Sequence, residues 1–418
     1  MKHTATLAEV IAVGDEMTSG QRLDTNSQWL AQQLNDLGVE VGFHSTVGDD
    51  LQRQTDVSRT AMGRADIVLM TGGLGPTKDD LTRQAIADAA DVELVCDTDA
   101  LAHIESIFTR NKRVMSPTNR AQAFYPAGGR TIHNEEGTAP GVDFSNGSSR
   151  VFAMPGVPYE MKLMWETYIG PKIAKRCGND QVIRHHVLRC FGIGESQAES
   201  MMPDLIDRQR QPRVGITASY SIISFRITAT ADSDQQCLEQ IADTEAYIRQ
   251  TLGEVVFGSG DETLSGVTAS LLDQNDLSVS FVDFQFGAAA AKQLRDGMSD
   301  PQRSRLHTCL AIENDPPEQW VGDNSLAGDD ILPAAAAKIR QQSNSDIGIA
   351  IGPFIGDRRE GHAKKFPVGI SFAPEIGEPI ENPTEIFRFA GHSSMRQIRS
   401  AYQVVDFLRR SLVHKFGS

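Results

Sequence analysis

The N-terminal segment alternates between short apolar runs and amphipathic runs, and this alternation restricts the fold more than any other feature. Strand-like runs cover residues 7–13, 39–47 and 65–71, and helical periodicity covers residues 26–38, 51–64 and 80–92. Strands and helices that alternate at this spacing predict a mostly parallel sheet with helices on both faces. The sequence therefore predicts a three-layer α/β domain.

Three loops leave the carboxyl ends of the predicted strands. They read GDEMTSGQRLDTN, VGDD and TGGLGPTKDD, and they are the glycine-rich and acid-rich loops of this region. In open sheets of this class, ligands lie beyond the carboxyl ends of the strands. We therefore expect a binding site at this edge of the sheet.

The loop TGGLGPTKDD combines bare backbone with negative charge. Gly72, Gly73 and Gly75 allow positive φ and let a ligand approach the backbone closely. We expect the next helix to begin near Asp79 or Asp80, so that its free N–H groups form an anion site. The alternative is that Asp80 only caps this helix. The loop matches neither GxxxxGK[ST] nor GxGxxG.

Carboxylates from the three loops are expected to crowd one rim. They belong to Asp15, Glu16, Asp24, Asp49, Asp50, Asp79 and Asp80. Such groups repel each other unless a cation joins them, and a hard divalent ion accepts carboxylate oxygens. A metal that also binds a substrate phosphate can acidify a water for attack on phosphorus. The alternative is a set of unrelated caps and turns, with Asn26 as the N-cap of the first helix.

Composition excludes several kinds of partner. The net charge of −15 opposes binding to nucleic acid or to an anionic membrane. No apolar run approaches the roughly 20 residues that cross a bilayer. The five cysteines are scattered and form no CxxC pair, which favours a cytoplasmic protein without a zinc site.

A second, smaller α/β region follows, and a third region completes the chain. Strands are predicted over HHVLRCFGI, SIISFRITATAD and VVFG, with a helix over QCLEQIADTEAYIRQTLG. This region has no basic GxxG clamp, so RNA binding is not expected. A late strand, DIGIAIG, indicates that the third region is also α/β.

Six motifs resemble, in order and spacing, the N-terminal domain of the competence/damage-inducible CinA family. They are VGDEMTSGQRLDTN, VGDD, TGGLGPTKDDLT, NRAQAFYPAGG, NEEGTAPG and MPGVPYEM. That domain is similar to the molybdopterin-binding MoaB/MogA fold, and Asp80 falls on the aspartate that ends its glycine-rich loop. The middle region resembles the family's small KH-like domain through FGIGES and TLGEVVFGSGDETL. The implied domains are residues 1–170, 171–257 and 262–418.

The resemblance implies a metal-dependent ADP-ribose pyrophosphatase that acts in pyridine-nucleotide salvage. It suggests a divalent metal (Mg, Mn or Co), a small nucleotide substrate and a homodimer. The expected catalytic residues are Asp80, Asp79, Asp24 and Glu16, of which Asp80, Asp24 and Glu16 would bind the metal. The expected substrate-binding residues are Gly72, Gly73, Gly75, Thr77, Asn26, Asn119, Gln122, Asn134, Thr138, Gly156 and Glu160. The alternative function is nucleotide or pterin binding without turnover, or an interaction role in competence or DNA damage.

The third region departs from the family pattern. Family members with nicotinamide-mononucleotide deamidase activity carry a serine motif like AESCTGG, and the corresponding segment here places Phe284 at the nucleophile and Gly287 and Ala288 at the paired glycines. Phenylalanine has no hydroxyl to attack an amide. The segment similar to YSNEAK is absent, and SDIGIAIGPFIGD replaces a TGIAGP-like turn. We expect a degenerate deamidase-like domain that keeps its fold and has lost its activity.

Overall fold

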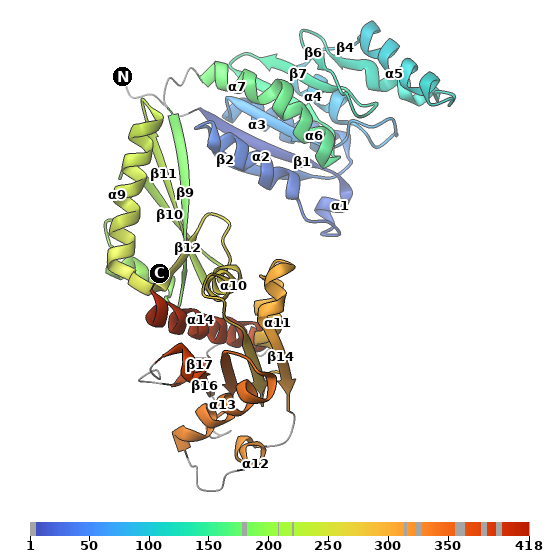
Figure 1. The fold of residues 1–418 in the computed structure, drawn as a ribbon. Helices are drawn as coiled ribbons and strands as arrows, with labels where there is room; N and C mark the ends of the chain where they lie inside the picture. The colour runs from blue at the N-terminus through green and yellow to red at the C-terminus, as the bar shows by residue number, and fades with distance from the viewer. Residues whose placement is uncertain are drawn as a thin grey trace. The chain divides into compact units, whose positions relative to one another are not determined.

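The computed structural model describes residues 6–177, 182–207, 209–219, 221–312, 316–322, 328–355, 364–377, 383–389 and 395–417. The chain divides into two compact units (Figure 1). The first spans Met1–Arg184 and Ala231–Asp234, and the second spans His185–Thr230 and Gln235–Ser418. No helix within the described ranges is long and apolar enough to pass through a membrane.

The first unit contains a six-stranded sheet in the order β2-β1-β3-β8-β7-β6. Its strands are β1 (Leu7–Val13), β2 (Glu40–Val47), β3 (Ile67–Thr71), β6 (Arg130–Ile132), β7 (Gly141–Asn146) and β8 (Ser149–Met154). Strands β2, β1, β3 and β8 are parallel, and β7 and β6 add an antiparallel edge. The predicted, mostly parallel sheet is confirmed.

Helices cover both faces of this sheet, as predicted. One core packs α2 (Thr25–Asp36) and the run α6 (Pro158–Met164), Trp165–Ile169 and α7 (Gly170–Cys177) onto the sheet through residues such as Leu30 and Trp165. The other core packs α3 (Leu51–Arg64) and α4 (Thr82–Ala90) through Ala61 and Ile86. Neighbouring residues of β1 alternate between the two cores, as the two faces of a strand require.

A small subdomain extends from the first unit at α5 (Thr98–Arg110). It also contains the two-stranded sheet of β4 (Leu94–Cys96) and β5 (Phe124–Pro126) and the turn η1 (Pro117–Ala123). Asp97 caps α5 by accepting hydrogen bonds from the amides of Asp99 and Ala100.

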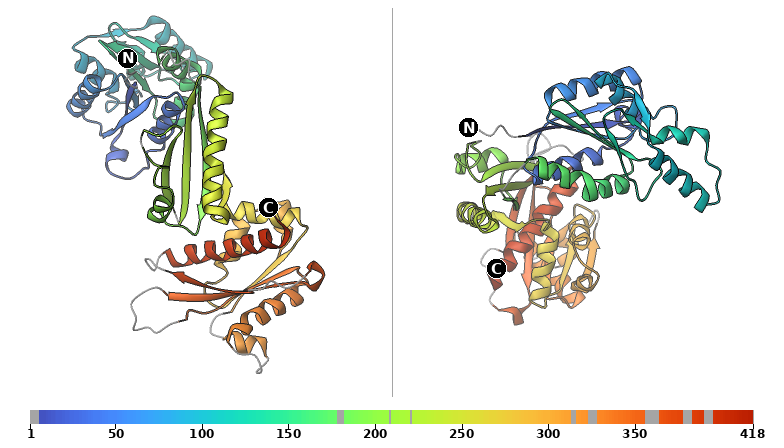
Figure 2. Two further views of the ribbon diagram at one scale, coloured as in Figure 1. Left: turned by 90° about the vertical axis from the view of Figure 1, so that its left-hand side faces the viewer. Right: turned by 90° about the horizontal axis from the view of Figure 1, so that it is seen from above.

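The middle region forms a four-stranded sheet in the order β10-β11-β9-β12. Its elements are β9 (Val182–Phe191), α8 (Glu195–Met201), β10 (Arg213–Ser219), β11 (Ile222–Ala231), α9 (Asp234–Leu252) and β12 (Val256–Ser259). Burial alternates residue by residue along β11, so one face of the sheet is covered. Helix α9 runs along the strands (Figure 2).

The C-terminal region contains a five-stranded sheet in the order β14-β13-β15-β16-β17. Its strands are β13 (Val279–Asp283), β14 (Leu306–Ala311), β15 (Ile347–Ile351), β16 (Lys364–Phe372) and β17 (Thr384–Phe389). One core contains α10 (Leu264–Gln274), α11 (Ala289–Asp296) and α14 (Arg396–Phe416), and the other contains α13 (Ile331–Ser343), beside which lies α12 (Pro317–Val321). Residues 356 and 357 of SDIGIAIGPFIGD lie outside the described residues.

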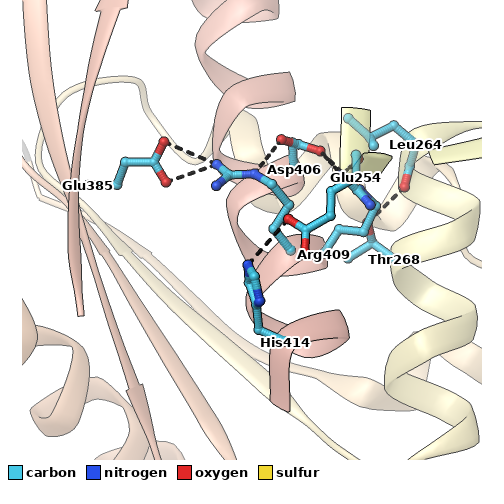
Figure 3. A network of polar contacts seen from close by, with 8 residues as sticks. Glu254, Leu264, Thr268, Glu385, Asp406, Arg409 and His414 are labelled. Atoms are coloured by element: carbon cyan, nitrogen blue, oxygen red, sulfur yellow. Dashed lines mark hydrogen bonds and ion pairs between the residues drawn. The ribbon is translucent and has the colours of Figure 1, made fainter. Parts of the chain in front are cut away.

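The middle and C-terminal regions share a core and a polar network. Phe191 and Phe257 of the middle sheet belong to the same apolar cluster as Leu408 of α14. Arg409 donates to the Glu254 carbonyl (2.8 Å) and to Asp406 Oδ1 (2.7 Å), as Figure 3 shows. The predicted boundary between residues 257 and 262 is therefore crossed by packing, and the three-domain division stays a prediction.

Candidate functional site

A cavity of about 490 Å³ lies at the carboxyl ends of β1, β3 and β8. It is the edge at which the sequence predicts a binding site. The lining residues come from the loops after these strands and after β2, with a wall from the η1 and β6–β7 segments. The predicted site residues among them are Glu16, Asp24, Asn26, Gly72, Gly73, Gly75, Asp79, Asp80, Gln122, Thr138, Gly156 and Glu160.

The glycines of the β3–α4 loop serve two different purposes. Gly72 and Gly73 have φ of 106° and 66°, which confirms the expected positive φ at these two positions. A Cβ on Gly72 would also collide with the Val13 carbonyl oxygen. Gly75 does not use this freedom, since its φ is not positive. A larger residue would not fit at position 75, because its Cβ would collide with the Asp80 carboxylate.

Asp80 supports the loop and does not cap the helix. Its Oδ1 accepts from the Gly75 amide (2.7 Å), and its Oδ2 accepts from the Thr77 amide (2.8 Å) and from the Thr77 hydroxyl. Helix α4 begins at Thr82, later than Asp79 or Asp80, and no side chain caps it at Leu81. The expected helix start and the capping alternative are both wrong, because the loop amides compete successfully for this carboxylate.

At the start of α2, Asp24 and Asn26 have other contacts than those expected. Asp24 is the N-cap, since its Oδ1 accepts from the Ser27 amide (2.9 Å). The alternative that made Asn26 the N-cap is wrong. The Asn26 amide instead donates to Thr71 Oγ1 (3.0 Å) and to the Gly156 carbonyl (2.9 Å), so it ties together the loops that follow β1, β3 and β8.

Carboxylates do converge on this rim. Asp15 and Asp49 exchange hydrogen bonds, each accepting from the other's amide at 3.0–3.1 Å. Burial raises the pKa of Asp49, and the nearby negative charges of Asp15, Asp79 and Glu16 raise it further. Hydrogen bonds from the Thr77 hydroxyl and from the backbone amide of Asp79 lower the pKa of Asp79, so this exposed carboxylate stays ionised. Asp50 instead caps α3 through the Arg53 amide.

The rim is not a ready-made metal site. Among the residues that the structure describes, no group of three or more His, Cys, Asp or Glu side chains is arranged to hold a metal ion. Both oxygens of Asp80 and one oxygen of Asp24 already accept backbone hydrogen bonds. A metal at this rim would need oxygens from its substrate and from water to complete its coordination, as Mg²⁺ usually does.

The opposite wall is a small hydrogen-bonded network. Gln122 donates to Thr138 Oγ1 (3.3 Å), and both residues line the cavity. Asn119 is buried behind them and donates to Gln122 Oε1 (3.0 Å). Asn134 donates to Glu160 Oε2 (2.7 Å) and so positions a carboxylate that lines the cavity. Asn119, Asn134 and Thr77 thus support lining residues.

Sequence reasoning missed two arginines. Arg22 lines the cavity from the loop after β1, for which the sequence predicted only acidic side chains at the rim. Arg83 is buried beneath the β3–α4 loop and donates to two loop carbonyls. A signal for Arg83 exists in the sequence, because it shares the apolar face of α4 with Ile86 and Ala87, at a helical spacing of three and four residues.

The loop after β13 keeps a backbone shape that suits paired glycines. Gly287 and Ala288 both have positive φ, at 62° and 70°. Buried Asp283 accepts from the amides of Phe286 and Ala288, which fixes the turn. Phe284 is buried, and its ring packs edge-on against Trp320 at 6.0 Å. An aromatic contact therefore stands where the resemblance places a nucleophile.

Comparisons with known proteins agree with this architecture. The family described as "Probable molybdopterin binding domain" matches residues 9–175, and the "Damage-inducible protein CinA KH domain" matches residues 185–258. A "Putative competence-damage inducible protein" of Lysinibacillus sphaericus (strain C3-41) is 31% identical over 411 residues, which cover 97% of each chain. The protein of the same name from Geobacillus sp. (strain WCH70) is 35% identical, with 94% of this chain and 95% of the relative covered. The crystal structure of "the protein CinA with unknown function from Thermoplasma acidophilum" is 34% identical and covers 41% of this chain and 98% of its own, with a TM-score of 0.38.

Proposed function

The chain belongs to the CinA family of competence/damage-inducible proteins, and we propose that its N-terminal domain hydrolyses the pyrophosphate of ADP-ribose or a related nucleotide with the help of a divalent metal. The observation that supports this proposal is the crowded anionic rim of the cavity. Burial raises the pKa of Asp49 there, and the charges of Asp15, Asp79 and Glu16 raise it further. An anionic substrate enters such a rim only together with a cation.

The cavity suits a nucleotide in size and in polarity. A volume of about 490 Å³ falls within the range of small-molecule sites. Bare backbone at Gly72 and Gly73 lets a phosphate approach closely, since neither residue carries a Cβ. The Gln122–Thr138 pair offers an amide and a hydroxyl to a ribose or a base.

A divalent ion would be shared between the protein and the substrate. Glu16 is our preferred ligand, since it lines the cavity, and Asp24 would contribute its second oxygen. An ion bound there supplies positive charge to the phosphates and acidity to a coordinated water. Asp80, which we expected among the ligands, has a supporting role in this proposal because its oxygens hold Gly75 and Thr77.

The reaction replaces the bridging P–O–P bond by one bond from water. The water oxygen binds to one phosphorus atom, and the bridging oxygen leaves with the other phosphate. For ADP-ribose the products are AMP and ribose 5-phosphate. One water proton passes to an ionised carboxylate of the rim, for which Asp79 is suited because it stays ionised.

The test is incubation of the purified chain with ADP-ribose and Mg²⁺, Mn²⁺ or Co²⁺, followed by detection of AMP. We expect AMP with at least one metal, none with a chelator, and a loss of about tenfold or more in Glu16→Gln and Asp79→Asn. Asp50→Asn is the matched control, since it changes a nearby acid that caps α3. If no metal supports AMP release, the proposal fails.

A second candidate is nucleotide or pterin binding without turnover. The hydrogen bonds that occupy Asp80 favour it, because they leave fewer carboxylate oxygens for a metal. Thermal-shift measurements separate the two functions. Stabilisation by ADP-ribose that requires a metal supports hydrolysis, and stabilisation without a metal supports binding alone. In either case we propose a cytoplasmic protein that binds a small molecule, a nucleotide in the leading proposal, and forms a homodimer.

A further inference from the structure

Arg83 is an unusual residue for the position that it occupies. It is the second residue of α4, and only 5% of its surface is exposed. Its Nη2 donates to the Leu74 carbonyl (2.8 Å) and to the Pro140 carbonyl (3.3 Å). The guanidinium therefore lies between the β3–α4 loop and the segment that leads into β7.

Stability alone does not account for this arginine. Burial lowers its pKa to about 10, and the charge that partly offsets this effect belongs to Asp80. Its Nε has no hydrogen-bond partner among the described residues. A buried cation whose hydrogen bonds are incomplete destabilises the fold, and apolar residues often replace such groups without loss.

Arg83 and Asp80 hold opposite sides of one peptide group. The Leu74 carbonyl accepts from Arg83, and the Gly75 amide, which belongs to the same planar peptide, donates to Asp80 Oδ1 at 2.7 Å. The carbonyl and the amide of a trans peptide point in opposite directions, so the two charged side chains fix the orientation of this peptide. Leu74 and Gly75 both line the cavity.

The same guanidinium also fixes the opposite wall. Pro140 directly follows Thr138 and Ala139, which line the cavity, and it precedes Gly141, the first residue of β7. One buried side chain thus joins the glycine-rich loop to the Thr138–Pro140 segment. These two segments face a bound phosphate group from different sides if the proposed function is correct.

We infer that Arg83 is a positioning residue that, together with Asp80, orients the Leu74–Gly75 peptide and sets the spacing between the glycine-rich loop and the Thr138–Pro140 segment for an anionic ligand. The identity of that ligand as a nucleotide pyrophosphate depends on the proposed function. We call the contacts of Arg83 and Asp80 with these two segments the clamp. The clamp does not depend on the proposed function, because it can be observed in the free protein.

The first test measures hydrogen exchange in the free full-length chain. In Arg83→Met we expect faster exchange in residues 72–80 and 138–141 than in the wild type, and little change in melting temperature. Arg83→Lys keeps one donor group and should recover part of the protection. Arg176→Met is the matched control, since exposed Arg176 also donates to a loop carbonyl, that of Ser148, in the same domain and does not line the cavity. It should leave both segments protected.

The second test measures affinity for inorganic pyrophosphate with the metal present. Arg83→Met should bind about tenfold more weakly than the wild type, which corresponds to 1.4 kcal/mol. The effects of Arg83→Met and Asp80→Asn should be less than additive in the double variant, because both act on one peptide. Arg176→Met should bind as the wild type does.

The outcomes separate the clamp from the hydrolase. Unchanged exchange in Arg83→Met, or additive effects with Asp80→Asn, would overturn the clamp even if the wild type releases AMP. Local loss of protection and weaker pyrophosphate binding would support the clamp even if the wild type releases no AMP from ADP-ribose.

Discussion

At the scale of single residues, most of the acids at the rim accept hydrogen bonds from the backbone, and one acid, Asp79, stays exposed. Asp24 and Asp80 accept hydrogen bonds from backbone amides, and Asp15 and Asp49 bind each other's amides. Asp79 is exposed and ionised. A carboxylate near a cavity is therefore not by itself evidence of catalysis here, and substitutions have to distinguish support from chemistry.

Asp80→Ala tests the supporting role. We expect a loss of activity of about tenfold or more, because the Gly75 and Thr77 amides lose their acceptor and the loop changes shape. The stability cost should be about 1 kcal/mol, as for a lost cap, and the melting temperature should fall by a few degrees. Activity on ADP-ribose and thermal melting check both values.

Asp50→Ala is the matched control for Asp80→Ala. It removes the cap of α3 and should lower the melting temperature by a similar amount while turnover stays near that of the wild type. If Asp80→Ala keeps full activity, the supporting role that we assign to this carboxylate is wrong.

Asp49→Asn tests, through pH, the cost of an ionised Asp49, which is half-buried beside other carboxylates. Because the pKa of Asp49 is raised in the fold, the folded chain binds more protons than the unfolded chain between pH 3.8 and the raised value. The free energy of unfolding therefore falls as pH rises through that window, and it stays lower by the same amount at neutral pH. The gain in melting temperature from Asp49→Asn should be larger at pH 7 than at pH 4. Equal gains at both values would contradict the prediction.

The pattern of strands and helices in the sequence predicted at which sheet edge the cavity lies, but not the hydrogen-bonding role of each acid there. The three loops could be placed at one sheet edge because strand and helix periodicity is a property of neighbouring residues. The alternative interpretation placed the N-cap at Asn26 although Asp24 holds it, since the choice depends on how the loop enters α2. The role of Arg83 depends on Pro140, which lies 57 positions away. No local pattern contains that contact.

At the scale of helices and strands, close packing of α13 onto the C-terminal sheet depends on glycine. A Cβ on Gly348 of β15 would collide with the backbone carbonyl of Ala336 in α13, and a Cβ on Gly369 of β16 would lie against Leu332. The helix can therefore sit closer to the strands than larger side chains would allow. Sequence pattern predicted strand β15 but not this requirement, since it concerns the distance between two elements.

Gly348→Ala should destabilise the chain by about 1–3 kcal/mol, because backbone atoms of α13 cannot move aside as a flexible side chain would. The free energy of unfolding is measured by chemical denaturation, with a signal from the C-terminal region such as the fluorescence of Trp320. Gly215→Ala is the matched control, since Gly215 lies in β10 and a Cβ there meets no atom within 4 Å. A loss of similar size in both variants would show that the effect does not come from the contact with α13, since the lower entropy of the unfolded alanine chain favours folding.

At the scale of the whole molecule, the C-terminal region supports the fold of the middle region. It shares one apolar core with the middle sheet, and Arg409 of α14 donates a hydrogen bond to the Glu254 carbonyl (Figure 3). Deleting it would expose that core. Sequence pattern predicted α/β structure here, but it treated residues 257 and 262 as a boundary because a loop between two elements gives no sign of packing across it.

The last prediction concerns the turn after β13, where the resemblance places a nucleophile. Gly287 and Ala288 have positive φ and Asp283 fixes the turn, but Phe284 is buried against Trp320 and has no group that attacks an amide. We therefore expect no ammonia from nicotinamide mononucleotide above a blank. Phe284→Ser should not restore it, because the tyrosine- and lysine-bearing segment is also absent. That variant should instead lose about 3–5 kcal/mol of stability as the aromatic contact becomes a cavity. Release of AMP from ADP-ribose by the same preparation would show that the protein is intact, and ammonia release at the rate of an active deamidase would show that another residue supplies the nucleophile.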